Sequence, residues 1–330
     1  MKRRASILLI AVGALASGGA QAQARRAGTK PRLIGFLGLY SASAYARFVN
    51  AFREGLSALG RREGKDLAIE YRWAEGSEDR LPELARQLVA LQPDVIVTHT
   101  AAGIRAAQAA TSTIPIVMGV SSDPVGLGHV SSLARPGGNT TGVSSQVVEL
   151  AAKRLELLKQ AAPRVQRIAG LLELTNPAAR QVDRDLQVAA KKLGVRLQVF
   201  DVNATPATLE SAFAAILRER MEALIVEPYP LVSGHSGRIV AFAAAHRLPT
   251  IGGLKQFADD GGLLAYGGDF AEGWRLAASY VHKILNGANP AELPVEQPTK
   301  FELTINLKTA QSLGLVIPQS LLVSASTLVR

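Results

Sequence analysis

Short apolar runs rich in β-branched residues alternate along the chain with longer segments of helical spacing. In the first part of the chain, the strand-like runs cover residues 32–37, 67–73, 94–98 and 114–120. The segments of helical spacing between them cover residues 44–59, 81–91 and 104–110. Gly60 and Gly64 follow the first helix as C-terminal glycines do. This alternation predicts βαβ units with a parallel sheet.

The same pattern restarts in the second part of the chain. Strands are predicted at residues 140–145, 167–172, 195–202, 223–226 and 249–251. Helices are predicted at residues 151–160, 177–193, 206–220, 238–246 and 270–285. The two similar runs divide near residues 137–145, and the glycine-rich stretch 261–268 suggests that the chain crosses back. Residues 290–298 read as a proline-rich linker. The prediction is an α/β protein with two doubly wound parallel-sheet lobes.

Residues 1–24 have the pattern of a cleavable secretory signal peptide. Lys2, Arg3 and Arg4 are followed by an apolar run over residues 7–16 and by overlapping A-x-A cleavage sites at residues 20–24. An uncleaved membrane anchor is the alternative, but a membrane-spanning helix needs about 20 apolar residues. We therefore expect an exported protein located in the periplasm.

Composition excludes several classes of protein. The chain has 330 residues, of which 48% are apolar, so it is long enough for two domains of about 150 residues. It contains no Cys, which excludes disulfides, thiolate metal sites, thiol nucleophiles and a lipid-modified signal peptide. The formal charge of +10 at first suggests an anionic partner. Basic residues are dispersed, however, and only 5% of residues are aromatic, so we expect no nucleic-acid binding.

Polar and aromatic residues follow the predicted strands, where ligands bind in open α/β sheets. In the first lobe the candidate ligand-binding residues are Tyr40, Ser41, Thr98, His99, Thr100, Ala101, Ser121, Ser122 and Asp123. In the second lobe they are Asn176, Asp201, Glu227 and Tyr229. This mixture of hydroxyls, carboxylates, amides and aromatic rings suits a small ligand that carries both an amine and a carboxylate.

Several of these candidates also have a structural alternative. Thr98 and Thr100 can offer hydroxyls to an anion at a helix start, or can simply cap that helix. Asp123 can receive a cation, as can Glu227, but Asp123 followed by proline is also typical of a turn or an N-cap. Tyr40 and Tyr229 can instead be half-buried packing residues.

Signatures of catalysis and of cofactor binding are absent from the sequence. There is no phosphate-binding G-x-x-x-x-G-K-[ST] loop, and no G-x-G-x-x-G follows a predicted strand. Residues 234–237 lack the G-x-S-x-G spacing of a nucleophile elbow, and the five histidines form no metal-binding pair. We therefore expect no catalytic residues, no cofactor and no metal.

A series of motifs in fixed order resembles a known family. The most specific are FREGL at 52–56, IEYRWAEG at 69–76, DPVG at 123–126, SLARPGGNTTG at 132–142, KRLELL at 153–158, KILNG at 283–287, LPVEQ at 293–297 and INLKTA at 305–310. Over about residues 32–328 the chain resembles the substrate-binding proteins of ABC importers that include tryptophan-binding members. That family has the type I periplasmic-binding fold.

The resemblance implies two lobes joined by a three-crossover hinge. Lobe one would comprise residues 32–142 plus about 267–297, and lobe two residues 143–266 plus about 298–330. The expected hinge residues are Gly138, Asn139, Gly142 and Gly267. His99 departs from the small residue expected at its position, so the ligand need not be tryptophan.

The resemblance further implies a periplasmic solute-binding protein that closes around its ligand by a hinge motion. We expect a small amphoteric ligand (an amino acid or an aromatic compound), an ABC permease in the inner membrane as partner, and a monomeric state. Two alternatives remain at this point. One is a ligand-sensing protein for a membrane signalling partner, and the other is an exported enzyme with Asp123, Glu227 or His99 as acid or base.

Overall fold

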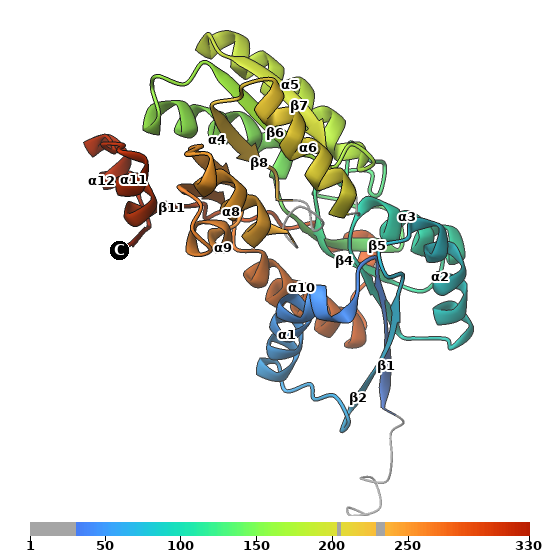
Figure 1. Cartoon of the computed structure of the whole chain (residues 1–330). Coiled ribbons are helices and arrows are strands. Elements are labelled where there is room, and N and C mark those ends of the chain that lie inside the picture. Colours follow the sequence, from blue (N-terminus) through green and yellow to red (C-terminus); the bar gives the residue numbers. More distant parts are fainter. Residues whose placement is uncertain (1–30, 203–205, 229–234) are drawn as a thin grey trace, which may run out of the picture. The chain divides into compact units, whose positions relative to one another are not determined.

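Five parallel strands form the first of two sheets. The structure, a computed structural model, describes residues 31–202, 206–228 and 235–330, so the predicted signal peptide lies outside the described residues (Figure 1). The sheet order is β2-β1-β3-β4-β5. The strands are β1 (Arg32–Gly38), β2 (Leu67–Trp73), β3 (Val95–Thr98), β4 (Ile116–Ser121) and β5 (Thr140–Ser144). Because residues 34–37 of β1 are all buried, this strand has the continuous apolar pattern of a parallel sheet covered on both faces.

Helices from two distant parts of the chain cover this first sheet. The helices are α1 (Ala42–Ala58), α2 (Leu81–Ala90), α3 (Ala101–Ala110) and α10 (Phe270–Leu285), with the 3₁₀ turn η2 (Glu78–Arg80) preceding α2. Helix α10 packs against α1 and β4 although more than 140 residues separate it from β4. Its Trp274 is fully buried and stacks on Phe36 of β1 with ring centroids 5.6 Å apart. The core of the first lobe is therefore completed by a segment from late in the sequence.

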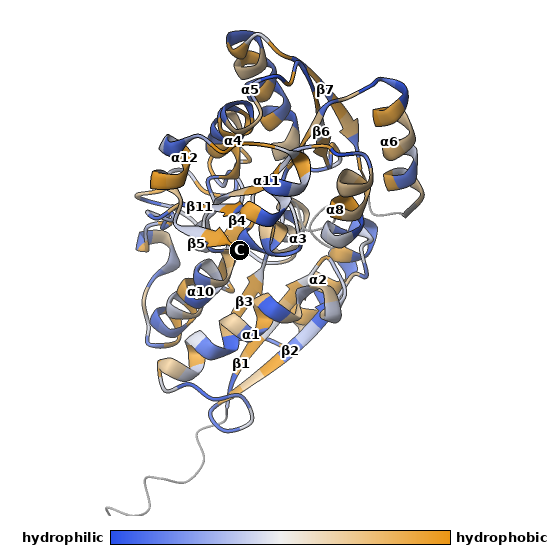
Figure 2. Ribbon diagram, turned by 60° about the vertical axis from the view of Figure 1, so that its left-hand side comes forward, coloured by the Kyte–Doolittle hydropathy of each residue, from blue (hydrophilic) through white to orange (hydrophobic). Residues whose placement is uncertain are grey.

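Seven strands form the second sheet, in the order β12-β11-β10-β9-β8-β6-β7. The strands are β6 (Arg167–Leu172), β7 (Arg196–Asp201), β8 (Ala223–Val226), β9 (Thr250–Gly252), β10 (Leu264–Gly267), β11 (Glu302–Asn306) and β12 (Thr327–Val329). Its helices are α4 (Val147–Ala161), α5 (Pro177–Leu193), α6 (Pro206–Arg218), α8 (Ser236–Ala245), α9 (Lys255–Asp259), α11 (Leu307–Leu313) and α12 (Gln319–Ser324). Only β10 and β11 pair in the antiparallel sense among the described strands. In Figure 2 the strands are largely apolar, whereas the helices carry both apolar and polar residues.

The sequence pattern did not predict β10, β11 and β12. These strands have only three to five residues, and β10 ends within a glycine-rich stretch. Such short strands take their stability from pairing with the edge of an existing sheet rather than from a local pattern. The predicted linker at 290–298 contains the 3₁₀ turn η3 (Pro290–Glu292), and its Glu296 pairs with Val143 of β5.

The chain passes three times between the elements of the two sheets. The first passage joins β5 to α4 at residues 145–146, and the second joins β10 to α10 at residues 268–269. The third lies between Glu296, which pairs with β5, and the start of β11 at Glu302. The predicted architecture of two α/β lobes with three crossovers is confirmed.

Candidate functional site

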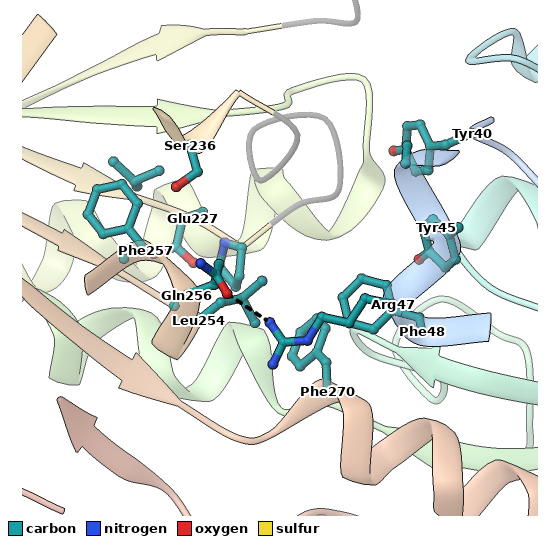
Figure 3. A pocket seen from close by; sticks show the side chains of 15 residues that line it. Tyr40, Tyr45, Arg47, Phe48, Glu227, Ser236, Leu254, Gln256, Phe257 and Phe270 are labelled. Carbon is teal, nitrogen blue, oxygen red and sulfur yellow. Dashed lines mark hydrogen bonds between the residues drawn. The ribbon is translucent and has the colours of Figure 1, made fainter. Parts of the chain in front are cut away.

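A cavity of about 230 Å³ lies where loops and helix starts of the two lobes face each other. Figure 3 shows side chains from both lobes pointing into it. The lining residues are Tyr40, Ala44, Tyr45, Arg47, Phe48, Val226, Glu227, Pro228, Ser236, Gly252, Gly253, Leu254, Gln256, Phe257 and Phe270. The cavity thus lies beyond the carboxyl ends of β1, β8 and β9, where open α/β sheets bind ligands.

An aromatic stack forms the wall of the cavity that belongs to the first lobe. The ring of Tyr45 stacks on that of His99 at a centroid distance of 3.9 Å, and Tyr40 lies 6.0 Å from the same imidazole. Phe48 extends the wall, since its ring lies 5.2 Å from Tyr45 and 6.4 Å from Phe270 at the start of α10. Because the rings support one another, this wall is a rigid aromatic surface.

His99 supports this wall from behind and does not line the cavity. It is only 1% exposed, and both ring nitrogens are buried without a hydrogen-bond partner among the described residues. Burial lowers the pKa of His99 to about 3. The imidazole is therefore neutral at physiological pH and serves as a flat apolar group between Tyr45, Tyr40 and Trp274.

A buried ion pair lies beneath the opposite wall. Glu227 follows β8, is 0% exposed, and accepts hydrogen bonds from Nε and Nη2 of Arg154 on α4, which is 1% exposed. Burial raises the pKa of Glu227, while the charge and the hydrogen bonds of Arg154 oppose that shift. The fork of the guanidinium matches the two carboxylate oxygens, which is the geometry that best compensates two desolvated charges.

The same guanidinium also contacts the backbone beside two crossovers. Nη2 of Arg154 donates to the carbonyl oxygen of Val147 at 2.9 Å, and Nη1 donates to that of Tyr266 at 3.4 Å. Val147 begins α4 directly after the first crossover, and Tyr266 lies in β10 shortly before the second. Arg154 therefore links a lining residue of the cavity to two of the three connections between the lobes.

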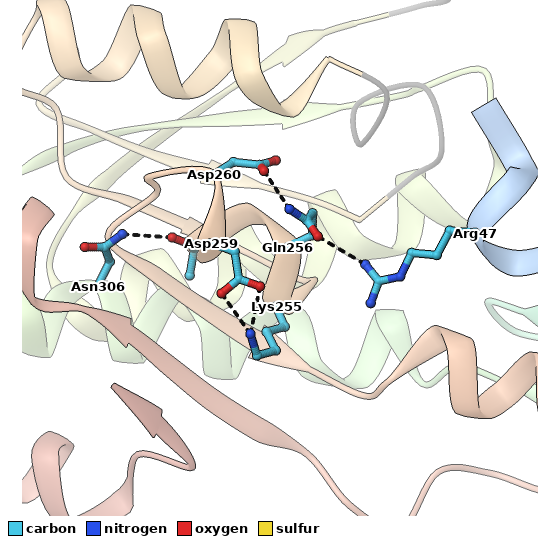
Figure 4. A network of polar contacts seen from close by, with 7 residues as sticks. Arg47, Lys255, Gln256, Asp259, Asp260 and Asn306 are labelled. Atoms are coloured by element: carbon cyan, nitrogen blue, oxygen red, sulfur yellow. Dashed lines mark hydrogen bonds and ion pairs between the residues drawn. The ribbon is translucent and has the colours of Figure 1, made fainter. Parts of the chain in front are cut away.

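A chain of polar contacts runs along one side of the cavity (Figure 4). Asp260 accepts a hydrogen bond from Ser236 at 2.8 Å and another from Nε2 of Gln256 at 2.7 Å. Oε1 of Gln256 in turn accepts from Nη1 of Arg47 at 3.4 Å. Arg47 belongs to α1 of the first lobe and Gln256 to α9 of the second, so this contact joins the two walls.

Glu173 is a buried carboxyl group close to both lobes. It follows β6, is 3% exposed, and its Oε2 has no hydrogen-bond partner among the described residues. Burial, together with the charges of Glu78 and Asp201, raises the pKa of Glu173 to about 8. Glu78 belongs to the first lobe, and the charge of Glu173 also contributes to the raised pKa of Tyr40. Glu173 directly follows a predicted strand, but it is not one of the candidate ligand-binding residues given above.

Among the candidates that the structure describes, only Tyr40 and Glu227 line the cavity. Five others accept hydrogen bonds from nearby backbone amides: Ser41, Thr100, Asp123, Asn176 and Asp201. The corresponding donors are the amides of Ala44, Gly103, Gly126, Ala178 and Leu174, at 3.3, 3.2, 2.8, 3.1 and 2.8 Å. Thr100 therefore caps the start of α3, and Asp123 caps a turn, as the structural alternative for each of them predicted.

Four further candidates, Thr98, Ala101, Ser121 and Ser122, do not line the cavity either. Thr98 is buried and its hydroxyl donates to the carbonyl oxygen of Leu37 at 3.0 Å. Ala101 and Ser121 are buried, and Ser122 is half-buried. Tyr229 lies outside the described residues.

Of the four expected hinge residues, Gly142 and Gly267 lie close to crossovers, whereas Gly138 and Asn139 do not. Gly142 has φ of +136° within β5, and a Cβ there would lie 2.3 Å from the Met118 carbonyl oxygen. A Cβ at Gly267, the last residue of β10, would lie 2.1 Å from the Gly253 carbonyl oxygen. Gly138 and Asn139 precede β5, at the end of the strand away from the first crossover. The amide of Asn139 donates there to the carbonyl oxygens of Thr111 and Ile114.

Most lining residues belong to helix starts and were not predicted. These are Tyr45, Arg47, Phe48, Ser236, Leu254, Gln256, Phe257 and Phe270. Tyr45 and Phe48 are separated by three positions and so share one face of α1. Aromatic residues at this spacing, directly after a predicted strand, are the feature of the sequence that could have indicated this wall of the cavity.

Among the described residues no group of three His, Asp or Glu side chains is placed to hold a metal ion. No helix in the same residues is long and apolar enough to cross a membrane.

Comparisons with known proteins agree with this geometry. The family profile described as ABC transporter substrate binding protein matches residues 34–329. A tyrosine-binding protein of Clostridioides difficile is 25% identical over 287 residues, which cover 87% of this chain and 82% of that protein.

Two solved structures share the fold over 91% of this chain and all of theirs, each with a TM-score of 0.82. One is an ABC domain in complex with L-Trp from Streptococcus pneumoniae, at 26% identity. The other is a conserved domain protein from Vibrio cholerae, at 29% identity.

Breaking the buried ion pair should destabilise the second lobe strongly. In Glu227→Gln the Arg154 guanidinium remains buried without a counter-charge, which should lower the free energy of unfolding by about 3–5 kcal/mol. Glu156→Gln is the matched control, because Glu156 forms an exposed pair with Lys153 on the same helix as Arg154. It should cost less than about 1 kcal/mol. Urea unfolding followed by circular dichroism measures both, and equal stability of the two variants would contradict the role given to the pair.

Replacing His99 by Phe should preserve the aromatic wall and improve stability in acid. The pKa of His99 is lowered in the folded state, so wild-type stability falls as the pH falls below the unfolded value of about 6.5. His99→Phe lacks this loss. Its free energy of unfolding, relative to that of wild type, should therefore increase by ~1–2 kcal/mol on going from pH 7.5 to pH 5. The exposed His246→Phe substitution controls for removal of a histidine as such. An identical pH dependence in His99→Phe and wild type would show that the imidazole is not buried uncharged.

Glu173 should make the protein less stable as the pH rises. Its folded pKa of about 8 lies above the unfolded value of about 4.3, so its stabilising contribution is complete below pH 4 and is lost towards pH 8. The free energy of unfolding of Glu173→Gln, relative to that of wild type, should therefore increase by at least about 1 kcal/mol between pH 6 and pH 9. Urea titrations at both pH values measure the gain, with Glu156→Gln as the control. A constant difference between variant and wild type would refute the raised pKa.

Proposed function

Because the chain belongs to the ABC transporter substrate-binding protein family, we propose that it is the periplasmic solute-binding component of an ABC importer. It would bind a small amphoteric molecule, which is an amino acid or an aromatic compound, and deliver it to an ABC permease in the inner membrane. The predicted signal peptide at residues 1–24 would direct its export, and one copy of the chain would suffice to form the site.

The observation that carries this proposal is the composition of the cavity. A volume of about 230 Å³ suits a small molecule. Tyr40, Tyr45, Phe48, Phe257 and Phe270 offer ring surfaces for an aromatic group. A few polar side chains on one side are of the kind that fixes the orientation of a ligand. A relative that binds tyrosine and a structural neighbour in complex with L-Trp support an aromatic amino acid as the first choice.

Closure of the lobes would be a hinge motion about the three crossovers. The moving bodies would be residues 32–144 with about 270–296, and residues 147–267 with about 302–330. These limits shift the boundaries expected from the sequence by a few residues, because β5 extends to Ser144 and β10 to Gly267. Gly142 and Gly267 each lie within three residues of a crossover, and a side chain at either position would clash with a backbone carbonyl oxygen. These two glycines would therefore keep the ends of β5 and β10, where the hinge starts, closely packed.

The positions of the candidate acids and bases favour binding over catalysis. Glu227 is bonded to Arg154, Asp123 caps a turn, and His99 is buried behind the aromatic wall. General acid–base catalysis needs a titratable group within hydrogen-bond reach of the substrate. A sensing role with a membrane signalling partner would use the same cavity, and the genes adjacent to this one would distinguish the two roles.

Ligand binding should raise the melting temperature and saturate at one molecule per chain. Protein unfolded and refolded to remove bound ligand would be titrated with L-tryptophan, L-tyrosine and L-phenylalanine, and with ribitol as a non-aromatic control. At 100 times Kd the bound form is stabilised by ≈ 2.7 kcal/mol. Phe48→Ala should weaken binding about tenfold or more, because it removes part of the aromatic wall.

Two outcomes would contradict the proposed function. One is the absence of any shift or calorimetric signal for all aromatic amino acids, after native mass spectrometry has shown the protein to be free of ligand. The other is turnover of the added compound rather than stoichiometric binding.

A further inference from the structure

Arg47 is a cationic side chain that reaches the cavity without a carboxylate partner in the described part of the chain. It extends from α1 towards the second lobe, as Figure 3 shows, and its one hydrogen bond there is the 3.4 Å contact to Gln256. An arginine guanidinium has five N–H donors. The contact to Gln256 uses one of these donors, so the guanidinium has further donors for a ligand.

The second lobe fixes the orientation of the amide that receives Arg47. Carboxylate oxygens accept hydrogen bonds, and one oxygen of Asp260 accepts from Nε2 of Gln256 at 2.7 Å. Ser236 donates to the other oxygen of Asp260 at 2.8 Å. The oxygen of Gln256 is consequently turned towards Arg47, which is an exposed residue at the side of the cavity (Figure 4).

Nearby charges leave the positive charge of Arg47 uncompensated. Glu227, the carboxylate in the lining, is bonded to Arg154. Lys255 borders the adjoining pocket and contacts both oxygens of Asp259, at 2.8 and 2.7 Å. Asp269 caps the start of α10 through the amide of Ala271. Glu302 also borders that pocket, but like Asp269 it forms no ion pair with Arg47 in the described structure.

We propose that Arg47 receives the carboxylate of the ligand and thereby makes the cavity selective for aromatic acids over their neutral analogues. A guanidinium pairs with a carboxylate through two parallel N–H···O bonds, which gives both affinity and orientation. With the carboxylate at Arg47, the remainder of the ligand lies against Tyr45, Phe48 and Phe270. This assignment rests on the proposed function, and it specifies which chemical group of the ligand the protein recognises.

A purely structural role for Arg47 is the competing explanation. In that case the contact to Gln256 would simply hold the lobes together, and removal of either partner would lower the affinity for every ligand equally. The two roles differ in whether the loss depends on the negative charge of the ligand, and the experiment measures that dependence.

The test compares L-tryptophan with L-tryptophanamide, in which only the carboxylate is replaced by a neutral amide. Isothermal titration calorimetry would be carried out on wild type, Arg47→Met and the control Arg53→Met. Arg53 lies on the same helix, pairs with Glu63 and does not line the cavity. Wild type should prefer L-tryptophan at least about tenfold, because a charge-assisted bidentate contact is worth 1.5–3 kcal/mol.

Arg47→Met should abolish this preference, whereas Arg53→Met should retain it within about threefold. An unchanged preference in Arg47→Met, or an equal loss for both compounds, would overturn the assignment of Arg47 while leaving the proposed function intact. Absence of binding of both compounds to the wild type would overturn the proposed function, and the assignment with it.

Discussion

The buried ion pair between Arg154 and Glu227 is the constraint on which the site depends. Both side chains are almost completely removed from solvent, so either one alone would be an uncompensated charge in the core of the second lobe. The guanidinium also bonds the carbonyl oxygens of Val147 and Tyr266, beside two crossovers. The wall of the cavity and the segments about which the lobes are proposed to move are thus held by one side chain. A ligand that displaces Glu227 would act on a side chain that also bonds the segments proposed as the hinge.

The two walls of the cavity differ in a way that suits an amphoteric aromatic ligand. The first lobe contributes a rigid ring stack in which His99, kept neutral by burial, supports Tyr45 from behind. The second lobe contributes an ordered polar chain that ends at Gln256. Arg47 extends from the aromatic side to the polar side. Under the proposed function, stacking would provide affinity for the ring, while the charged group at the edge would determine which ring-bearing molecules are accepted.

The sequence predicted the architecture because parallel strands buried on both faces leave continuous apolar runs, as at residues 34–37. It did not predict β10 to β12, whose strand conformation comes from pairing with neighbours far away in the chain. Among the site residues, strand-end reasoning found Tyr40 and Glu227. It could not distinguish ligand contacts from caps at Thr100 or Asp123, because both roles use the same residue types. Arg47 and Phe257 line one cavity only through the arrangement of two lobes, and the pairing of Arg154 with Glu227 spans 73 positions.

We propose the cavity between the aromatic wall and the polar chain as the ligand-binding site. A crystal structure of the protein with L-tryptophan, prepared after removal of bound ligand, is the most direct test. We expect electron density for the indole against Tyr45 and Phe48, with the Arg154–Glu227 pair intact beneath the opposite wall. Density for the ligand at another surface, with this cavity empty, would show that the binding site lies elsewhere.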